Sequence, residues 1–279
     1  LAGAANNGQA CMTGKFGCDY TNDGSRLKRP YIREDGMLRK ATWDEALERI
    51  KQGLAGRTPG EVAIITSPRG SNEDQYSAAK FARTVLNTTN IDSALNSDHA
   101  LLSQLEVRLG AGAATNPIWD LEDAKCLLVV AGNPTEEQNV LAVAAKKAAR
   151  KEAKMIVIDS RETELTRYAD EWLRPRPGSE ALLIAGIGRA IFDEALEGKE
   201  FVATRIEQGE ALKQSLWAFD LEKVSRDTGI EASQIRQAAR IFATSDAGAI
   251  LLGANGLDDS AAEKLVDAAV DLSAITGNI

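Results

Sequence analysis

The sequence is poor in several residue types that support common site chemistries. It has one histidine and three cysteines in 279 residues, and aromatic residues make up only 5%. A single histidine, His99, excludes a multi-histidine metal site and any histidine-based triad elsewhere in the chain. The cysteines, Cys11, Cys18 and Cys126, are odd in number and match no zinc-binding spacing, so they argue against a disulfide framework and for a reducing cytoplasm.

Two further absences limit the partners. Acidic residues outnumber basic ones by 41 to 33, and the net charge of −8 argues against a surface for nucleic acid. The chain contains no run of about 18 apolar residues, so no segment is predicted to span a membrane. Residues 1–8 lack the basic and apolar regions of a signal peptide, and we expect both ends of the chain to be cuts in a longer protein.

The composition that remains is typical of a soluble globular protein, with 44% hydrophobic and 27% charged residues. Residues 1–30 are rich in Gly, Asn and Asp and are predicted to be irregular. Residues 31–41 predict a short hairpin that turns at Asp35-Gly36. Thr42 is the predicted N-cap of a helix, with Glu45 completing a capping box. The apolar face of that helix would consist of Ala46, Leu47, Ile50 and Leu54.

From residue 62 onward, apolar strands alternate with amphipathic helices, which indicates an α/β fold with parallel sheets flanked by helices. Buried strands are predicted at 62–66, 126–131, 155–159 and 249–253, the second and third paired in parallel. A helix is predicted to follow the loop at 132–135 and to end at about residue 152. The other predicted helices are 72–87, 99–109, 179–196, 209–218, 220–228, 231–244 and 258–275.

Candidate binding residues follow three of these strands, because ligands of open parallel sheets bind beyond the carboxyl ends of the strands. Gly132, Asn133 and Glu136 lie in a loop that leads into a helix, so that free backbone N–H groups could face a phosphate. The loop is neither a GxGxxG nor a Walker sequence, and an ordinary strand-to-helix turn is the alternative.

The next strand ends at Asp159-Ser160-Arg161, about 25 residues later. An acidic residue at this place commonly binds a ribose hydroxyl, and a nearby arginine pairs with phosphate. A helix cap with a surface arginine is the alternative. Gly253, at the end of the last strand, would let the backbone approach a ligand closely, unless it marks a plain turn.

Asp98 and His99 form the remaining candidate pair. They stand at the start of the helix predicted at 99–109, and Asp98 is well explained as an N-cap without chemistry.

Several segments resemble the molybdopterin oxidoreductase superfamily, above all the large subunit of formate dehydrogenases and the large G chain of NADH:quinone oxidoreductase. Residues 7–17 resemble the family segment G-R-L-C-V-K-G-R-F-G, and residues 26–33 with 41–47 resemble R-L-x-x-P-L-I-R followed by A-S-W-D-E-A-L. Residues 110–134 resemble a longer family segment that ends in I-L-V-I-G-S-N-P. Residues 157–161, 173–180 and 272–279 resemble V-V-D-P-R, L-x-L-R-P-G-T-D and L-A-L-L-T-G-N-I.

This resemblance implies a formate dehydrogenase/DMSO reductase-like fold. Residues 1–30 would be a remnant of an iron–sulfur domain, residues 31–95 the first part of one α/β domain, and residues 96–279 a second, Rossmann-like, dinucleotide-binding domain. The implied cofactors are molybdopterin guanine dinucleotide and a 4Fe-4S cluster. Cys11 matches the last of four cluster cysteines. The segments at 132–136, 159–161 and 177–180 match those that hold one guanine dinucleotide, which adds Gly178 and Glu180 to the candidates.

The sequence also departs from the family pattern. Gln138 replaces a common His, and Ser179-Glu180 replaces Thr-Asp. Thr13 stands where the family has a Lys between cluster and pterin. Asp98 stands at the position of the metal-ligating Cys or selenocysteine of formate dehydrogenases, just before His99.

These departures leave three functional hypotheses. The first is part of a G chain of the NADH dehydrogenase type that acts in electron transfer. The alternative is the catalytic subunit of a molybdenum or tungsten formate dehydrogenase-like enzyme, with Asp98 as metal ligand and His99 assisting proton removal. The third is a non-enzymatic nucleotide-binding module. Other subunits of a redox complex are the expected partners, with membrane association only through them, and the isolated chain is expected to be inactive and to hold no cofactor.

Overall fold

The computed structural model describes residue 3 and residues 6–67, 70–93 and 99–279. It divides into two compact units: residues 11–96, here the N-terminal unit, and residues 97–279 with residues 1–10, here the sheet unit. No helix among the described residues is long and apolar enough to cross a membrane.

The N-terminal unit consists of short elements. They are α1 Met12–Phe16, η1 Gly17–Asn22, β1 Tyr31–Glu34, β2 Met37–Lys40, α2 Trp43–Leu54, η2 Pro59–Glu61, β3 Ile64–Thr66, α3 Asn72–Thr84 and β4 Ile91–Ser93. Strands β1 and β2 pair antiparallel, and β3 and β4 pair in parallel.

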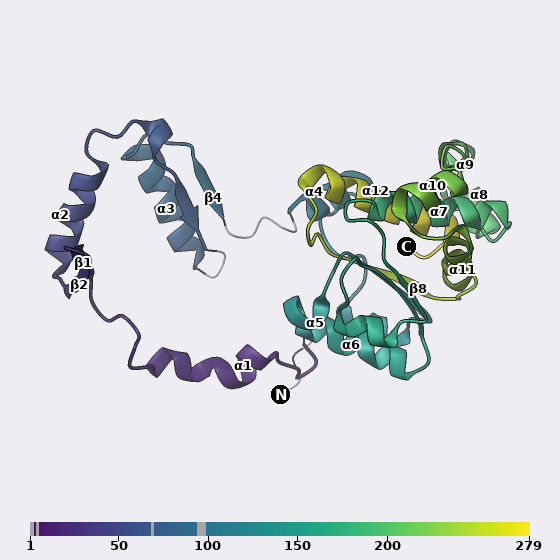
Figure 1. Cartoon of the computed structure of the whole chain (residues 1–279), viewed down its shortest axis with the longest axis horizontal. Coiled ribbons are helices and arrows are strands. Elements are labelled where there is room, and N and C mark those ends of the chain that lie inside the picture. Colours follow the sequence, from purple (N-terminus) through teal and green to yellow (C-terminus); the bar gives the residue numbers. More distant parts are fainter. Residues whose placement is uncertain (1–2, 4–5, 68–69, 94–98) are drawn as a thin grey trace. The chain divides into compact units, whose positions relative to one another are not determined.

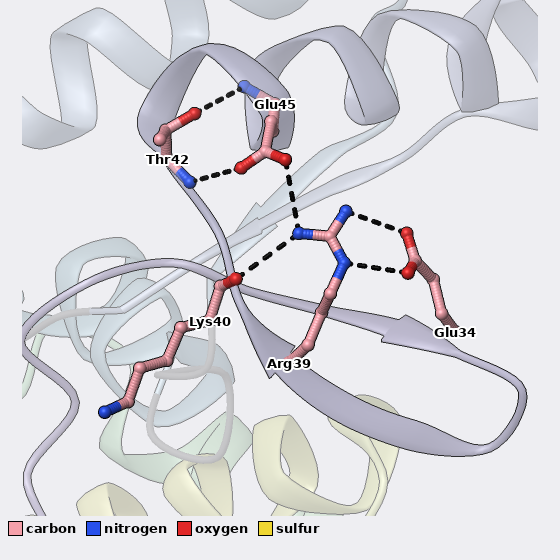
Figure 2. A network of polar contacts seen from close by, with 5 residues as sticks. All are labelled: Glu34, Arg39, Lys40, Thr42 and Glu45. Atoms are coloured by element: carbon pink, nitrogen blue, oxygen red, sulfur yellow. Dashed lines mark hydrogen bonds and ion pairs between the residues drawn. The ribbon is translucent and has the colours of Figure 1, made fainter.

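The predicted hairpin and capping box are both confirmed. Asp35 and Gly36 adopt positive φ values of 48° and 79°, as a tight two-residue hairpin turn requires. The Thr42 hydroxyl accepts a hydrogen bond from the backbone N–H of Glu45, whose carboxylate accepts one from the N–H of Thr42. Arg39 joins the two elements: it contacts Glu34 at 2.7 and 2.8 Å and Glu45 at 3.2 Å, as Figure 2 shows.

Burial in this unit differs from the prediction. The strand predicted as buried at 62–66 begins only at Ile64, and Ile65 is 76% exposed. The reason is that β3 belongs to a two-stranded sheet against which α3 packs, and the face that carries Ile65 remains exposed. The apolar face predicted for α2 is likewise open, with Leu47 and Ile50 more than half exposed.

The sheet unit is built on four parallel strands in the order β7-β6-β5-β8. They are β5 Cys126–Val130, β6 Lys154–Ile158, β7 Glu171–Leu173 and β8 Gly248–Leu252. The predicted parallel pairing of β5 with β6 is confirmed, with Val130 opposite Ile158, and β8 pairs with β5 on its other side. All five residues of β5 are buried, as expected for a central strand covered on both faces.

Alternate residues of these strands enter two separate cores, because successive side chains point to opposite faces of a sheet. Leu128 and Ile156 pack with the helices α7, α11 and α12 on one face, whereas Leu127 and Met155 pack with α6 and the short helices η3 and η4 on the other. Figure 1 shows α6 on one side of the sheet and the group from α7 to α12 on the other. The fold class predicted from the sequence, α/β with a parallel sheet flanked by helices, is confirmed.

The helices of the sheet unit are α4 His99–Leu109, η3 Ile118–Asp123, α5 Pro134–Glu137, α6 Asn139–Arg150, η4 Glu164–Tyr168, α7 Glu180–Asp193, α8 Lys199–Arg205, α9 Gly209–Leu216, α10 Leu221–Thr228, α11 Ala232–Ala243 and α12 Asp259–Thr276. The sequence analysis missed α8 and the short strands β4 and β7. Each spans seven residues or fewer, too few to display a periodic pattern.

Candidate functional site

The carboxyl ends of the four parallel strands lie along one edge of the sheet, and backbone hydrogen bonds join the loops that follow them. The N–H of Ala131 donates to the carbonyl of Ile158 at 3.0 Å, and the N–H of Gly253 donates to the carbonyl of Val130 at 2.9 Å. The N–H of Asp159 donates to the carbonyl of Leu173 at 3.2 Å. The structure therefore brings Gly132, Asp159 and Gly253, three residues predicted from separate strands, to one edge.

The loops after β5 and β8 pass very close to each other. A Cβ atom added to Gly253 would lie 2.5 Å from the carbonyl oxygen of Ala131 and 2.6 Å from Cα of Gly132. Ala131 takes a positive φ of 49°, which is unusual for alanine, and its carbonyl accepts a hydrogen bond from the N–H of Asn255 at 3.1 Å. Gly253 thus has a structural reason to be glycine: the approach of the two loops excludes any side chain there.

The loop after β5 differs from the prediction in one respect. The helix expected to begin there is only the four-residue turn α5, and Gln138 leaves the helical conformation before α6 begins at Asn139. Glu136 is exposed in that turn, and the N–H groups of Glu136 and Glu137 both donate to the carbonyl of Asn133, at 3.0 and 3.1 Å. The single helix predicted after this loop is therefore wrong, because it is interrupted at Gln138. Asn133 is buried at this edge, and phosphate binding at Gly132–Glu136 stays a prediction.

Asp159 is a buried carboxylate with one free oxygen. The residue as a whole is only 4% exposed. Oδ1 accepts a hydrogen bond from the backbone N–H of Arg161 at 2.8 Å and lies 3.5 Å from Nε of that arginine. Oδ2 is buried and has no hydrogen-bond partner among the described residues. A buried acceptor without a partner costs stability, and a ligand that donates to Oδ2 would remove that cost.

Glu180, the first residue of α7, is a second buried carboxylate and is 5% exposed. Burial raises its pKa, backbone N–H groups of Glu180 and Gly178 oppose that rise, and the nearby charge of Asp159 adds to it. Gly178 precedes α7 with a φ of 84°, in the segment 177–180 that the family resemblance singles out.

The Glu180 side chain lines a hollow of about 190 Å³ between the first turns of α7 and α12. Gly178 lines it from the same side, and the other side is lined by Asp258, the N-cap of α12, and by Ser260 and Lys264 of α12. The sequence analysis missed these three residues, because in the sequence they are ordinary polar residues of a helix start.

A substitution at Glu180 tests this electrostatic description. The folded-state pKa is raised, so the protein binds the Glu180 proton more tightly when folded, and the resulting stability is lost as the pH rises through that pKa. At neutral pH, Glu180→Gln is therefore expected to raise the free energy of unfolding by about 0.5–2 kcal/mol, the usual range of a stabilising substitution. Denaturant unfolding measures it.

The gain should disappear below the ordinary glutamate pKa of about 4.3, where both states are protonated. Glu136→Gln is the matched control, since this exposed carboxylate should change the unfolding free energy by less than about 0.5 kcal/mol. If the gain in unfolding free energy of Glu180→Gln instead grew as the pH fell, the raised pKa of Glu180 would be contradicted.

His99 begins α4, and its Nδ1 lies 2.8 Å from the hydroxyl of Ser103. The residues that follow it, Ala100 and Leu101, pack with Ala254 in the loop after β8 and with α12. The start of α4 thus lies beside the edge of the sheet at which the four parallel strands have their carboxyl ends, here called the strand-end edge. Asp98, the predicted metal ligand, lies outside the described residues.

Cys11 belongs to the N-terminal unit, where it caps α1. Its Sγ accepts a hydrogen bond from the backbone N–H of Gly14 at 3.4 Å, and this bond is the main reason for its lowered pKa. A lowered pKa favours the thiolate, the form that ligates metal. Within the part of the chain that the structure describes, no three His, Cys, Asp or Glu side chains gather closely enough to hold a metal ion.

Comparison with known proteins gives a consistent result. The model of the family "Molybdopterin oxidoreductase" matches residues 26–279. The chain is 35% identical over 275 residues to F420-dependent formate dehydrogenase 1 subunit alpha of Methanococcus maripaludis, covering 98% of this chain and 41% of the relative. It is 34% identical over 289 residues to formate dehydrogenase H of Escherichia coli, covering 99% of this chain and 40% of the relative.

A third relative, the NADPH-Fe(3+) oxidoreductase subunit alpha of Geobacter sulfurreducens, is 31% identical over 282 residues, which cover 98% of this chain and 33% of that protein. The chain therefore spans about two fifths or less of the length of these curated relatives. Among solved structures, acetylene hydratase from Pelobacter acetylenicus superimposes with a TM-score of 0.71 at 24% identity, covering 100% of this chain and 39% of that one. At this identity the likeness concerns the fold alone.

Proposed function

We propose that this chain, which belongs to the molybdopterin oxidoreductase family, is the part of a formate dehydrogenase-type catalytic subunit that holds one guanine dinucleotide of the pterin cofactor. Two of the relatives described above are formate dehydrogenases by name, and they match nearly the whole chain. They favour the formate dehydrogenase alternative over the NADH dehydrogenase G chain that the sequence analysis placed first.

The strand-end edge fits a dinucleotide in two respects. The free, buried Oδ2 of Asp159 can accept a hydrogen bond from a ribose hydroxyl, which is the usual role of an acidic residue at this place in dinucleotide folds. The tight pairing of Gly132 with Gly253 keeps side chains out of the middle of the edge, so that a ligand can lie against the backbone. The free Oδ2 of Asp159 is the observation that carries the proposal.

When bound, the molybdopterin cofactor would supply a metal centre for two-electron chemistry, in which formate gives carbon dioxide, one proton and two electrons. Asp159 and the backbone around Gly132 and Gly253 would bind and orient the nucleotide. His99 is the proposed proton acceptor: Ser103 engages its Nδ1, so Nε2 is the nitrogen that can exchange a proton. Asp98 as metal ligand and Cys11 as one ligand of a 4Fe-4S cluster belong to the same proposal.

The full-length protein that contains this chain tests the proposal. We expect the purified protein to contain close to one molybdenum or tungsten per subunit, with pterin, and to reduce an artificial viologen acceptor when formate is added. Metal analysis, pterin fluorescence and the formate-dependent rate are the measurements. Absence of metal, pterin and formate-dependent reduction from a folded protein carrying its iron–sulfur clusters would favour the G-chain hypothesis instead. The names of the relatives as alpha subunits support partner subunits, which co-purification would reveal.

A further inference from the structure

Helix α4, which begins at His99, packs along α12, as Figure 1 shows. The two helices share a small apolar cluster, to which α4 contributes Ala100 and Leu101 and α12 contributes Ala262 and Val266. Apolar attraction is non-directional. The cluster therefore holds α4 against α12 without determining how far along α12 it lies.

Polar contacts between the same two helices determine that position. The side-chain amide of Gln104 donates to Oδ1 of Asp267 at 2.7 Å. Nη2 of Arg108 donates to Oδ1 of Asp271 at 2.5 Å. Both pairs join residues 163 positions apart, so successive turns of α4 face successive turns of α12 and the two helices run in the same direction.

Arg108 connects the two pairs. Its Nη1 donates to Oδ1 of Asp267 at 2.9 Å, so one guanidinium group spans both carboxylates of α12. The side chains of Arg108 and Asp271 are 31% and 26% exposed, and the contacts form a network rather than an isolated surface pair. Charge-assisted hydrogen bonds from a planar guanidinium group are directional, unlike the apolar contacts beside them. We call Gln104, Arg108, Asp267 and Asp271 the α4–α12 clamp.

The clamp has a consequence for His99 because an α-helix moves along its axis as a rigid element. A shift of α4 along α12 by the rise of one residue would displace His99 by about 1.5 Å. A general base must lie within hydrogen-bonding distance of the proton that it takes, and a misplacement of about 1 Å can cost about a hundredfold in rate. Helix α12 follows the β8 loop directly, with Asp258 as its N-cap, so it provides a reference that is joined to the strand-end edge.

We propose that Arg108 is a positioning residue, which through Asp267 and Asp271 fixes α4 along α12 and thereby places His99 at the strand-end edge. This inference rests on the proposed function, in which His99 accepts the proton that formate releases. All four residues of the clamp lie outside the segments that carry the family resemblance.

Variants of the full-length enzyme test the inference. Arg108→Gln should lower kcat for formate oxidation about tenfold or more, because His99 is then no longer held in place. KM should change by less than about twofold, since the proton is taken in the reaction step and not on binding. Molybdenum or tungsten content should stay at the wild-type value. Arg108→Lys keeps the charge but has no fork to span two carboxylates, so it should recover only part of the lost kcat.

A double variant tests whether Arg108 and Asp271 act as one clamp. Asp271→Asn alone should also lower kcat. The double variant Arg108→Gln/Asp271→Asn should have the kcat of Arg108→Gln within about twofold, because the second change removes no further contact of the clamp. Losses of kcat that multiply in the double variant would show that the two residues act separately and would overturn the inference.

Hydrogen exchange of the same full-length proteins gives a readout that does not depend on activity. Arg108→Gln should raise the exchange of the backbone amides of α4 and leave those of β5 and β6 unchanged. Arg240→Gln is the matched control, because Arg240 of α11 makes a similar two-fold contact with Glu194, the C-cap of α7, at 2.6 and 3.0 Å. This control should leave both the exchange of α4 and kcat at their wild-type values.

The outcomes separate this inference from the function on which it rests. An active wild-type enzyme whose Arg108→Gln variant has a wild-type kcat, or unchanged exchange in α4, would overturn the positioning role alone. A folded wild-type protein without metal, pterin and formate oxidation would contradict the proposed function, and the positioning role would fall with it.

Discussion

Replacing His99 with asparagine in the full-length enzyme is expected to lower kcat for formate oxidation by about 10²- to 10⁴-fold, the usual contribution of a general base. The reaction releases one proton together with two electrons. An asparagine side chain can retain a polar contact with Ser103, where Nδ1 of His99 now lies at 2.8 Å. It cannot exchange a proton near neutral pH, so the substitution removes the proposed chemistry and retains the local structure.

Two controls make this result specific. Molybdenum or tungsten content should be the same in the variant and the wild type, because His99 is not assigned as a metal ligand. Ser103→Ala should lower kcat by much less, since Ser103 only positions the ring. A His99→Asn enzyme with normal metal content and a wild-type kcat would remove His99 from the mechanism.

The architecture of the sheet unit was largely predictable from the sequence, for a physical reason. Its strands are continuous apolar runs because they are covered on both faces, and such runs as Leu127–Val130 are the strongest local signal of a parallel sheet. The long helices have the amphipathic period of a covered surface, and their predicted ends fall within a few residues of the observed ones. Strand β7, with three residues and the pattern Glu171-Trp172-Leu173, offered no comparable signal.

Burial in the N-terminal unit could not be predicted in the same way. An apolar pattern records which side chains suit a buried environment, but it does not say which part of a protein provides the cover. The faces of α2 and β3 that carry Leu47, Ile50 and Ile65 leave these three side chains more than half exposed. Sequence patterns thus located the hairpin, α2, β3 and α3, and they overestimated the burial of β3.

The candidate site was predictable where strand ends determine it, and not where helices contribute. Asp159 and Gly253 follow apolar strands. Because the carboxyl ends of parallel strands lie at one edge of a sheet, the sequence alone predicts that these two residues lie at that edge. Lys264 lies in the second turn of α12, the helix that begins after the β8 loop, and only the packing of α12 against α7 brings it near Glu180. Such a juxtaposition depends on tertiary structure and leaves no local signal.

Replacing Gly253 with alanine is expected to be among the most destabilising single changes in the sheet unit. The new Cβ would lie 2.5 Å from the Ala131 carbonyl oxygen and 2.6 Å from Cα of Gly132. Both neighbours are backbone atoms that a rotamer change cannot move, so the loops after β5 and β8 must separate. That separation weakens the hydrogen bonds from Gly253 to Val130 and from Asn255 to Ala131. We expect a loss of about 3 kcal/mol, at the upper end of the usual cost of overpacking.

The same loops provide graded controls that distinguish a backbone clash from a general sensitivity of the edge. Gly132→Ala should cost less than Gly253→Ala, because its Cβ would meet the Gly253 backbone no closer than 3.3 Å. Gly256→Ala meets no atom within 4 Å but has a φ of +76°, so it should cost about 1 kcal/mol through backbone strain alone. Thermal and denaturant unfolding of the three variants should give this order. A Gly253→Ala protein as stable as Gly256→Ala would show that the loops after β5 and β8 are not in close contact. The proposal that a nucleotide lies against the backbone around Gly132 and Gly253 would then lose its basis.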